Sequence, residues 1–186
     1  MRADVTKKLF TVDEYYRMVD AGILAENDRV ELIEGEIIEM SPIGRSHMAC
    51  VDRATDVFTS SLKGRALISV QNPLRLNNYN EPQPDIVVLK PRADYYASKS
   101  HTPEDTFLVL EVSDSTLRYD TKVKLPIYAR TGVSEVWIEN LQEDLLLVCR
   151  DPAGKGYSTQ LTLRRGDSIS PLAFPDVVLK IEELLG

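Results

Sequence analysis

Pro84-Asp-Ile-Val-Val-Leu89 and Phe107-Leu-Val-Leu-Glu-Val-Ser113 are two short runs of β-branched and large apolar residues, each bounded by polar turn residues. This pattern is typical of buried β-strands. An antiparallel pair that sets Leu89 opposite Phe107 also sets Asp85 opposite Glu111. Two carboxylates would then lie side by side at one end of the strand pair.

The alternation of side chains gives this strand pair two faces. We expect one face to hold Asp85, Val87, Leu89, Val109, Glu111 and Ser113, and the other to hold Ile86, Val88, Leu108, Leu110 and Val112. A carboxylate within an apolar run is expensive to bury unless a cation compensates it, and two converging carboxylates can bind a divalent cation. The alternatives are that each acid is a solvated residue or cap, or that Glu111 is an edge-strand charge that prevents aggregation.

A lysine that would complete such a site is absent two residues after the strand glutamate, where the chain has Ser113. The helix that follows offers Lys122 and Lys124 instead. Lys124 lies one helical turn from both Asp120 and Tyr128, so Asp120 could hold it and direct it to the strand end. An ordinary surface ion pair is the alternative for Lys124.

The rest of the chain predicts further elements around these strands. A helix should begin at Thr11 with a capping box to Glu14 and end near Gly22, and a hairpin should turn at Glu34-Gly35. We also expect a helix over 46–61 with Met48, Val51, Ala54, Thr55 and Phe58 on one face, a strand over 66–70, and a helix over 120–131 with Asp120 as N-cap and Gly132 as C′. Strands over 133–140, 145–150 and 157–163 and a turn over 151–156 should follow. The C-terminus should end in a short helix, or in a strand and a helix. The sequence predicts one α/β domain over residues 1–186.

Composition and charge exclude several classes of protein. The 186 residues are 43% hydrophobic and 27% charged, which argues against a disordered or low-complexity chain. A net charge of -7 argues against a protein that coats nucleic acid by charge alone, although residues 61–125 carry more basic than acidic residues. Cys50 and Cys149 stand among apolar neighbours and are expected to be buried thiols. No apolar run approaches a membrane span, and we expect the cytoplasm as the compartment and no membrane partner.

The motifs together resemble a known family. The chain reads Pro84-Asp85-Ile-Val-Val, Leu110-Glu111-Val-Ser113-Asp-Ser115, Tyr119-Asp120-Thr-Lys-Val-Lys124 and, near the N-terminus, Arg29-Val-Glu31-Leu-Ile-Glu-Gly35. This combination resembles the Uma2 family, also called DUF820, which belongs to the PD-(D/E)XK nuclease superfamily. The resemblance implies a restriction-endonuclease-like α+β fold, in which helices flank a mixed central β-sheet, together with the N-terminal helix and hairpin.

The resemblance also implies roles for individual residues. Asp85 and Glu111 would hold Mg²⁺ or Mn²⁺ together with the backbone carbonyl of Val112, and Glu31 would contribute a further acid. Lys124 would take the place of the lysine that the pattern expects at Ser113. Further candidates to line the site are His47, Gln71, Ser113, Asp120, Lys122 and Tyr128.

The function that follows is a metal-dependent DNA endonuclease that hydrolyses phosphodiester bonds, with DNA as substrate. Two alternatives stay open: a catalytically inactive nuclease fold that serves as a nucleic-acid-binding or protein-interaction module, and a metal-dependent hydrolase of small molecules. We also expect a homodimer, because cutting both DNA strands usually calls for two sites. Candidate dimer surfaces are the strands over 133–138 and 145–149 and the apolar C-terminus.

Overall fold

A six-stranded mixed sheet forms the centre of the protein. The computed structural model describes residues 6–25, 27–154 and 156–186. The strand order is β3-β4-β5-β6-β7-β8, and β5 and β6 run parallel while the other neighbours are antiparallel. The strands are β3 (Leu67–Val70), β4 (Ile86–Leu89), β5 (Thr106–Ser113), β6 (Glu135–Asn140), β7 (Leu145–Ala153) and β8 (Gly156–Leu163). The predicted mixed central sheet is confirmed.

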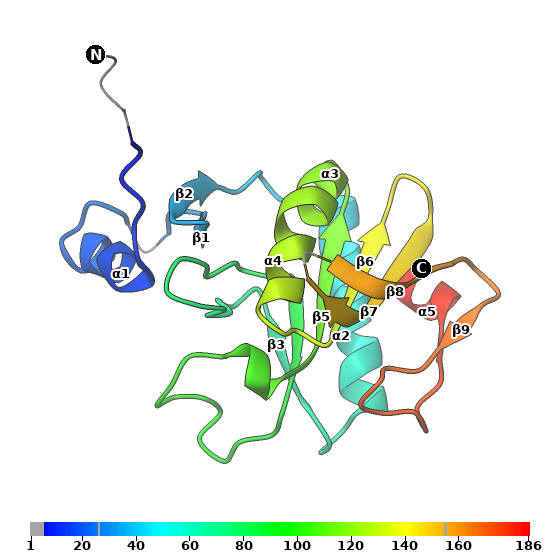
Figure 1. Cartoon of the computed structure of the whole chain (residues 1–186). Coiled ribbons are helices and arrows are strands. Elements are labelled where there is room, and N and C mark those ends of the chain that lie inside the picture. The colour runs from blue at the N-terminus through cyan, green and yellow to red at the C-terminus, as the bar shows by residue number, and fades with distance from the viewer. Residues whose placement is uncertain (1–5, 26, 155) are drawn as a thin grey trace.

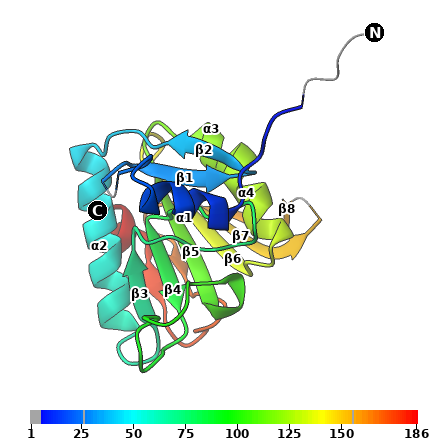
Figure 2. The same ribbon diagram turned by 90° about the vertical axis from the view of Figure 1, so that its left-hand side faces the viewer.

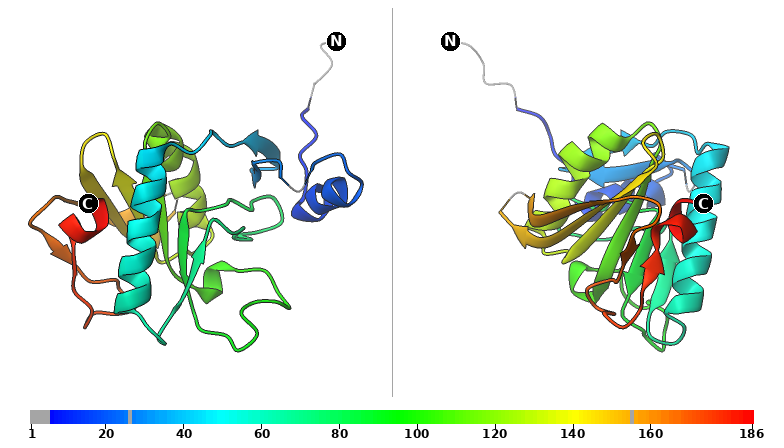
Figure 3. Two further views of the ribbon diagram at one scale, coloured as in Figure 1. Left: turned by 180° about the vertical axis from the view of Figure 1, so that it is seen from behind. Right: turned by 90° about the vertical axis from the view of Figure 1, so that its right-hand side faces the viewer.

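Helices cover both faces of this sheet (Figures 1 and 3). Helix α2 (Arg45–Ser61) and the short α5 (Ile181–Leu185) pack on one face around Phe58 and Trp137. The other face is covered by α3 (Leu117–Tyr119), η2 (Asp120–Lys124) and α4 (Leu125–Arg130), whose largest buried side chain is Tyr128. The predicted two-faced strand pair is confirmed, since Val87 and Val109 lie in the second cluster and Ile86 and Leu110 in the first.

The register of β4 against β5 agrees with the prediction at the end that carries the carboxylates. Ile86 pairs with Leu110, so the two strands are aligned as expected next to Asp85 and Glu111. A bulge between Val88 and Leu89 shifts the other end, so that Leu89 lies opposite Thr106 and not Phe107 as predicted. A bulge adds a residue to one strand only, and no apolar pattern reveals it.

The helical connection between β5 and β6 differs from the predicted helix over 120–131. It begins at Leu117, and Asp120 is not its N-cap. The Leu125 N–H bonds the Asp120 carbonyl five residues earlier, which makes η2 a π-helical turn. Pro126 follows in the first turn of α4, directly after the π-helical turn. Gly132 ends the connection with a φ of 85°, as predicted.

The N-terminal elements form a small unit beside the sheet (Figure 2). Helix α1 (Val12–Asp20) has the predicted capping box between Thr11 and Glu14. Strands β1 (Val30–Ile33) and β2 (Glu36–Glu39) form the predicted hairpin, and Glu34 and Gly35 supply the positive φ values of its turn. The hairpin packs on the segment before β4 through a bridge between Leu32 and Glu81, which brings Glu31 toward the end of the sheet.

Several details of the prediction are wrong. Met48 is 49% exposed, and Cys50 takes the expected place of Met48 on the buried face of α2. Strand β7 continues to Ala153, so most of the predicted turn over 151–156 is strand, and Lys155 lies outside the described residues. Unpredicted elements are η1 (Pro103–Asp105) and β9 (Ser168–Ile169), which pairs with β10 (Leu179–Lys180) ahead of the expected C-terminal helix.

Most of the candidate dimer surfaces lie inside the protein, although Val178 in the C-terminal segment is 67% exposed. All six residues of β6 are buried, β7 lies between β6 and β8, and Ile181, Leu184 and Leu185 of α5 pack into the core. These segments are apolar because they form the core, so they cannot serve as the predicted interface. Both cysteines are free and buried, as expected. Within the described ranges, no helix is long and apolar enough to cross a membrane.

Candidate active site

A cavity of about 680 Å³ opens where the ends of several elements meet. The hairpin contributes Glu31, α2 contributes His47, and the strand ends contribute Asp85 and Glu111, with Lys124 from η2. Gln71, Val112, Asp120 and Lys122 also line the cavity. Ser113 and Tyr128 do not line it, but they bond to carboxylates that do.

The Asp85 carboxylate is held at the open end of β4 by three donors. Its Oδ2 accepts the Val112 N–H at 2.9 Å and lies 3.1 Å from His47 Nε2, while its Oδ1 accepts the Gln71 amide at 3.2 Å. The backbone pairing of β4 with β5 ends at Ile86 and Leu110. Beyond this point the Asp85 side chain, and not the backbone, accepts the Val112 N–H. The hydrogen bond between His47 and Asp85 raises the pKa of His47.

Val112 presents its backbone carbonyl toward the same place. In an antiparallel pair, the N–H and C=O of one residue point to the same neighbouring strand. Because the Val112 N–H donates to Asp85, its carbonyl also points to the β4 side of β5. The Asp85 carboxylate and the Val112 carbonyl thus place oxygen atoms, which are hard ligands, at the same corner of the cavity.

Lys124 lies between two buried carboxylates. Its Nζ is 3.1 Å from Glu31 Oε2 and 3.3 Å from Glu111 Oε1, and all three side chains are less than 10% exposed. The Tyr128 hydroxyl donates to the same Glu111 oxygen at 2.6 Å. Both contacts fall on Glu111 Oε1, and no hydrogen bond to Glu111 Oε2 is found among the described residues.

Burial and charge act in opposite directions in this cluster. Burial raises the pKa of Glu111 to about 8, against the attraction of Lys124, and the charges of Asp120 and Asp85 raise it further. For Lys124, burial alone would lower the pKa, but the carboxylates of Glu111 and Glu31 outweigh burial and raise it. Lys124 therefore carries a positive charge at neutral pH, and an added cation beside Glu111 would favour its ionised form.

Asp120 does not hold Lys124 by an ion pair. Its Oδ2 accepts the hydroxyls of Ser113 and Thr116, each at 2.7 Å. The π-helical turn causes this difference, because it brings Asp120 against the end of β5 and carries Lys124 across to Glu31. Ser113 thus anchors the helical connection, and its position is not open to a lysine.

Two features of the site were not foreseen from the sequence. The Tyr119 hydroxyl is buried beside Lys124, whose Nζ lies 6.0 Å from the Tyr119 ring, and this hydroxyl has no partner among the described residues. Glu139, next to Val112 on β6, is fully buried and contacts the Cys50 thiol. Glu139 stands in the apolar run Val136-Trp-Ile-Glu-Asn140. A carboxylate within an apolar run was also the reason for selecting Glu111, so the same signal could have found Glu139.

The donor set fits a hard divalent cation. Within the described residues, no group of three His, Cys, Asp or Glu side chains converges on one point. Mg²⁺ needs no such group, because one or two carboxylates and several waters usually hold it. Asp85, Glu111 and the Val112 carbonyl supply only oxygen ligands, and Glu111 Oε2 is suited to the same ion.

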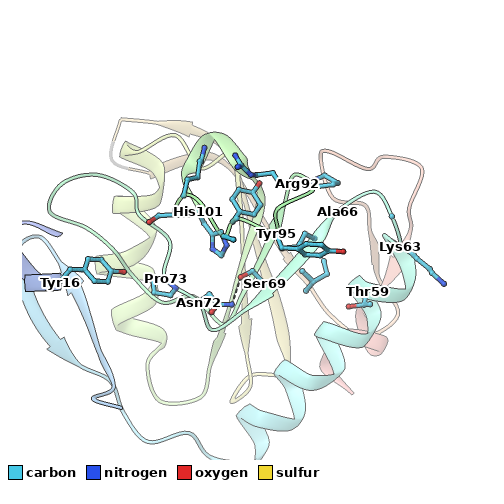
Figure 4. Close-up of a pocket in the computed structure, with 18 residues that line it drawn as sticks. Tyr16, Thr59, Lys63, Ala66, Ser69, Asn72, Pro73, Arg92, Tyr95 and His101 are labelled. Atoms are coloured by element: carbon cyan, nitrogen blue, oxygen red, sulfur yellow. Dashed lines mark hydrogen bonds between the residues drawn. The ribbon is translucent and has the colours of Figure 1, made fainter. Parts of the chain in front are cut away.

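A larger cavity, of about 1080 Å³, lies along the free edge of β3 (Figure 4). Its lining includes Tyr16, Lys63, Arg92, Tyr95 and His101. None of the buried carboxylates described above lines this larger cavity. The candidate active site is therefore chosen by the chemistry of its lining and not by its volume.

Comparisons with known proteins identify the family and a shared fold. The model of a family described as "Uma2: Putative restriction endonuclease" matches residues 12–182. The crystal structure of a protein from Anabaena variabilis, titled a "putative nuclease belonging to DUF820", superposes with a TM-score of 0.71. It is 19% identical and the match covers 95% of this chain and 97% of the other, which shows a shared fold. A search of curated proteins gives no match.

Proposed function

This chain belongs to the Uma2 family, and from that premise we propose that it is a metal-dependent endonuclease that hydrolyses phosphodiester bonds of DNA. The observation that carries the proposal is the cluster of Asp85, Glu111 and Lys124 at one sheet end. It combines two acids for a divalent cation with a buried ammonium for a phosphate. A small-molecule hydrolase would not explain the family match.

Asp85, Glu111 and the Val112 carbonyl would hold Mg²⁺ or Mn²⁺. When bound, such an ion supplies an acidified water and stabilises charge on the phosphate. His47 and Gln71 keep Asp85 in one orientation, and Tyr128 does the same for Glu111. Both carboxylates are therefore positioned before any ligand arrives, which reduces the cost of reorganisation.

Lys124 would act on the scissile phosphate. Its ammonium is fixed by Glu31 and Glu111 and stays protonated, so it stabilises negative charge and does not accept a proton from water. Glu31 is itself oriented by the Gln83 N–H at 3.1 Å. Glu31 is thus a positioning residue that holds the lysine at the cavity floor.

The test is cleavage of plasmid and linear DNA with Mg²⁺ or Mn²⁺ by the wild type and by Asp85→Ala and Glu111→Ala. We expect metal-dependent cleavage that falls by at least about 100-fold in each variant. Glu143→Ala, an exposed acid that does not line the cavity, is the matched control and should cut like the wild type. Cleavage that survives both substitutions would contradict the assignment, and DNA binding without cleavage would favour the inactive binding module.

A further inference from the structure

The rim of the cavity differs in charge from its floor. The floor carboxylates, Glu31, Asp85, Glu111 and Asp120, are all buried. Arg118 and Lys122 also line the cavity, but both side chains are exposed. Within the described residues, neither side chain forms an ion pair or a hydrogen bond, whereas Lys124 is paired twice.

The helical connection separates these charges by its geometry. Arg118 and Lys122 are exposed, whereas Asp120 and Lys124, each two residues further along, are buried. The two cations therefore lie on the exposed side of the helical connection, and Asp120 and Lys124 lie on its buried side. The helical connection thus places the buried ammonium of Lys124 at the floor of the cavity. It places the exposed side chains of Arg118 and Lys122 at the rim.

The hairpin adds a third cation. Arg29, at the start of the hairpin, lines the cavity, is exposed, and donates to the Ser41 carbonyl at 2.9 Å. The hairpin and α3 are distant in the sequence, and both contribute to the lining of the cavity. Glu39 and Asp114 are further lining acids, and neither is paired with Arg118 or Lys122. The exposed charged residues of the lining are thus three cations, Arg29, Arg118 and Lys122, and one acid, Glu39.

From this arrangement we infer that Arg118 and Lys122 bind backbone phosphates of the nucleic-acid strand beside the phosphate in the site. This inference rests on the proposed nuclease function and specifies how the substrate is held. A nucleic-acid strand carries one negative charge per phosphate, so each of two unpaired cations that line the cavity can contact one phosphate. Unpaired arginine and lysine side chains engage phosphates without the cost of breaking an existing ion pair.

The inference is tested by fluorescence anisotropy of a labelled DNA duplex in EDTA, where no metal-dependent cleavage can occur. Each phosphate contact contributes about 0.9 to the slope of log affinity against log salt. Arg118→Ala/Lys122→Ala should therefore lower this slope by about 1.8. Raising salt from about 50 to about 200 mM should then cost the double variant roughly tenfold less affinity than the wild type.

The control is Arg164→Ala/Lys180→Ala, which removes the same charge from exposed residues that do not line the cavity. Its slope should equal that of the wild type, and an equal loss in both double variants would overturn the inference. Conservative Arg118→Lys/Lys122→Arg should restore most of the affinity. No DNA binding by the wild type would also overturn it.

Cleavage kinetics separate this inference from the nuclease proposal. In a cleaving wild type, the double variant should raise KM with a much smaller change in kcat, because flanking contacts bind ground state and transition state alike. Normal KM in that variant would refute the phosphate contacts while the nuclease function stands. The expected salt slopes without any cleavage would support the contacts and refute the nuclease.

Discussion

Lys124 is positively charged although its side chain is only 8% exposed. Glu31 and Glu111 make this possible, because each lies within 3.3 Å of its ammonium. The pattern of the sequence pointed to Lys124 but paired it with Asp120. The true partners come from a hairpin about 90 residues earlier and from the preceding strand, and no local spacing encodes that meeting.

Replacing Lys124 should therefore damage both stability and activity. Lys124→Ala leaves two buried carboxylates without their cation, and breaking a buried pair costs about 3–5 kcal/mol. Lys122→Ala is the matched control for stability, because this lysine is exposed and unpaired. Urea unfolding should show about 3 kcal/mol or more lost in the first variant and less than about 0.5 kcal/mol in the second. Equal stability of both variants would refute the buried pair.

Glu139 is a second buried acid whose protonation is linked to folding. Burial raises its pKa to about 8 from an ordinary value of 4.5, against the influence of Cys50 and Arg53. The folded state therefore binds more protons than the unfolded state between these values. The contribution of Glu139 is fully present below about pH 4.5 and is lost as pH rises toward 8.

The wild type should accordingly lose stability relative to Glu139→Gln as pH rises from about 5 to about 8. The difference should change by up to about 1.4 kcal/mol per pH unit. Denaturant unfolding at several pH values measures it, with Glu143→Gln, an exposed acid after β6, as control. A Glu139→Gln curve parallel to the wild type would show that Glu139 is ionised in the fold.

At the scale of elements, the sequence was most informative where the structure is local. The capping box at Thr11, the turn at Glu34-Gly35 and the two faces of β4 and β5 all follow from short patterns. The π-helical turn, by contrast, adds a residue to a helical repeat that looks continuous in the sequence. Such turns are frequent at functional sites, and here the turn decides which lysine faces inward.

The hairpin turn offers a test of how Glu31 is positioned. Gly35 has a φ of 76°, and a Cβ there would lie 2.7 Å from the Leu9 Cβ. Gly64 has the same φ with nothing within 4 Å, so it is a matched control for backbone strain. Gly64→Ala should cost about 1 kcal/mol, while Gly35→Ala should cost at least about 1 kcal/mol more and reduce cleavage. Equal losses in thermal unfolding would contradict the close packing.

At the scale of the whole molecule, the net charge of -7 is compatible with a nucleic-acid substrate. Some of the acids form the cavity floor, and free cations stand at its entrance. The sequence showed that residues 61–125 carry more basic than acidic residues. It did not show that the acids lie at the floor of the cavity and the cations at its rim, because this depends on which face of the helical connection is buried.

The expected homodimer stays a prediction, and the fold narrows where it could form. With β6, β7 and α5 in the core, the strands of the six-stranded sheet that have a free edge for pairing are β3 and β8. Sedimentation of the wild type at micromolar concentration should show a dimer. A monomer under these conditions would refute the predicted dimer. Because a monomer has one site, it should then nick one DNA strand at a time.

Asp85, Glu111 and the Val112 carbonyl are the donors that we propose for a divalent cation. Anomalous diffraction from a crystal soaked in Mn²⁺ locates such an ion. We expect one strong peak within bonding distance of these three oxygen donors, and its loss in Glu111→Gln. A peak elsewhere, or none at these oxygens in crystals of a protein that cleaves DNA with Mn²⁺, would contradict this proposal.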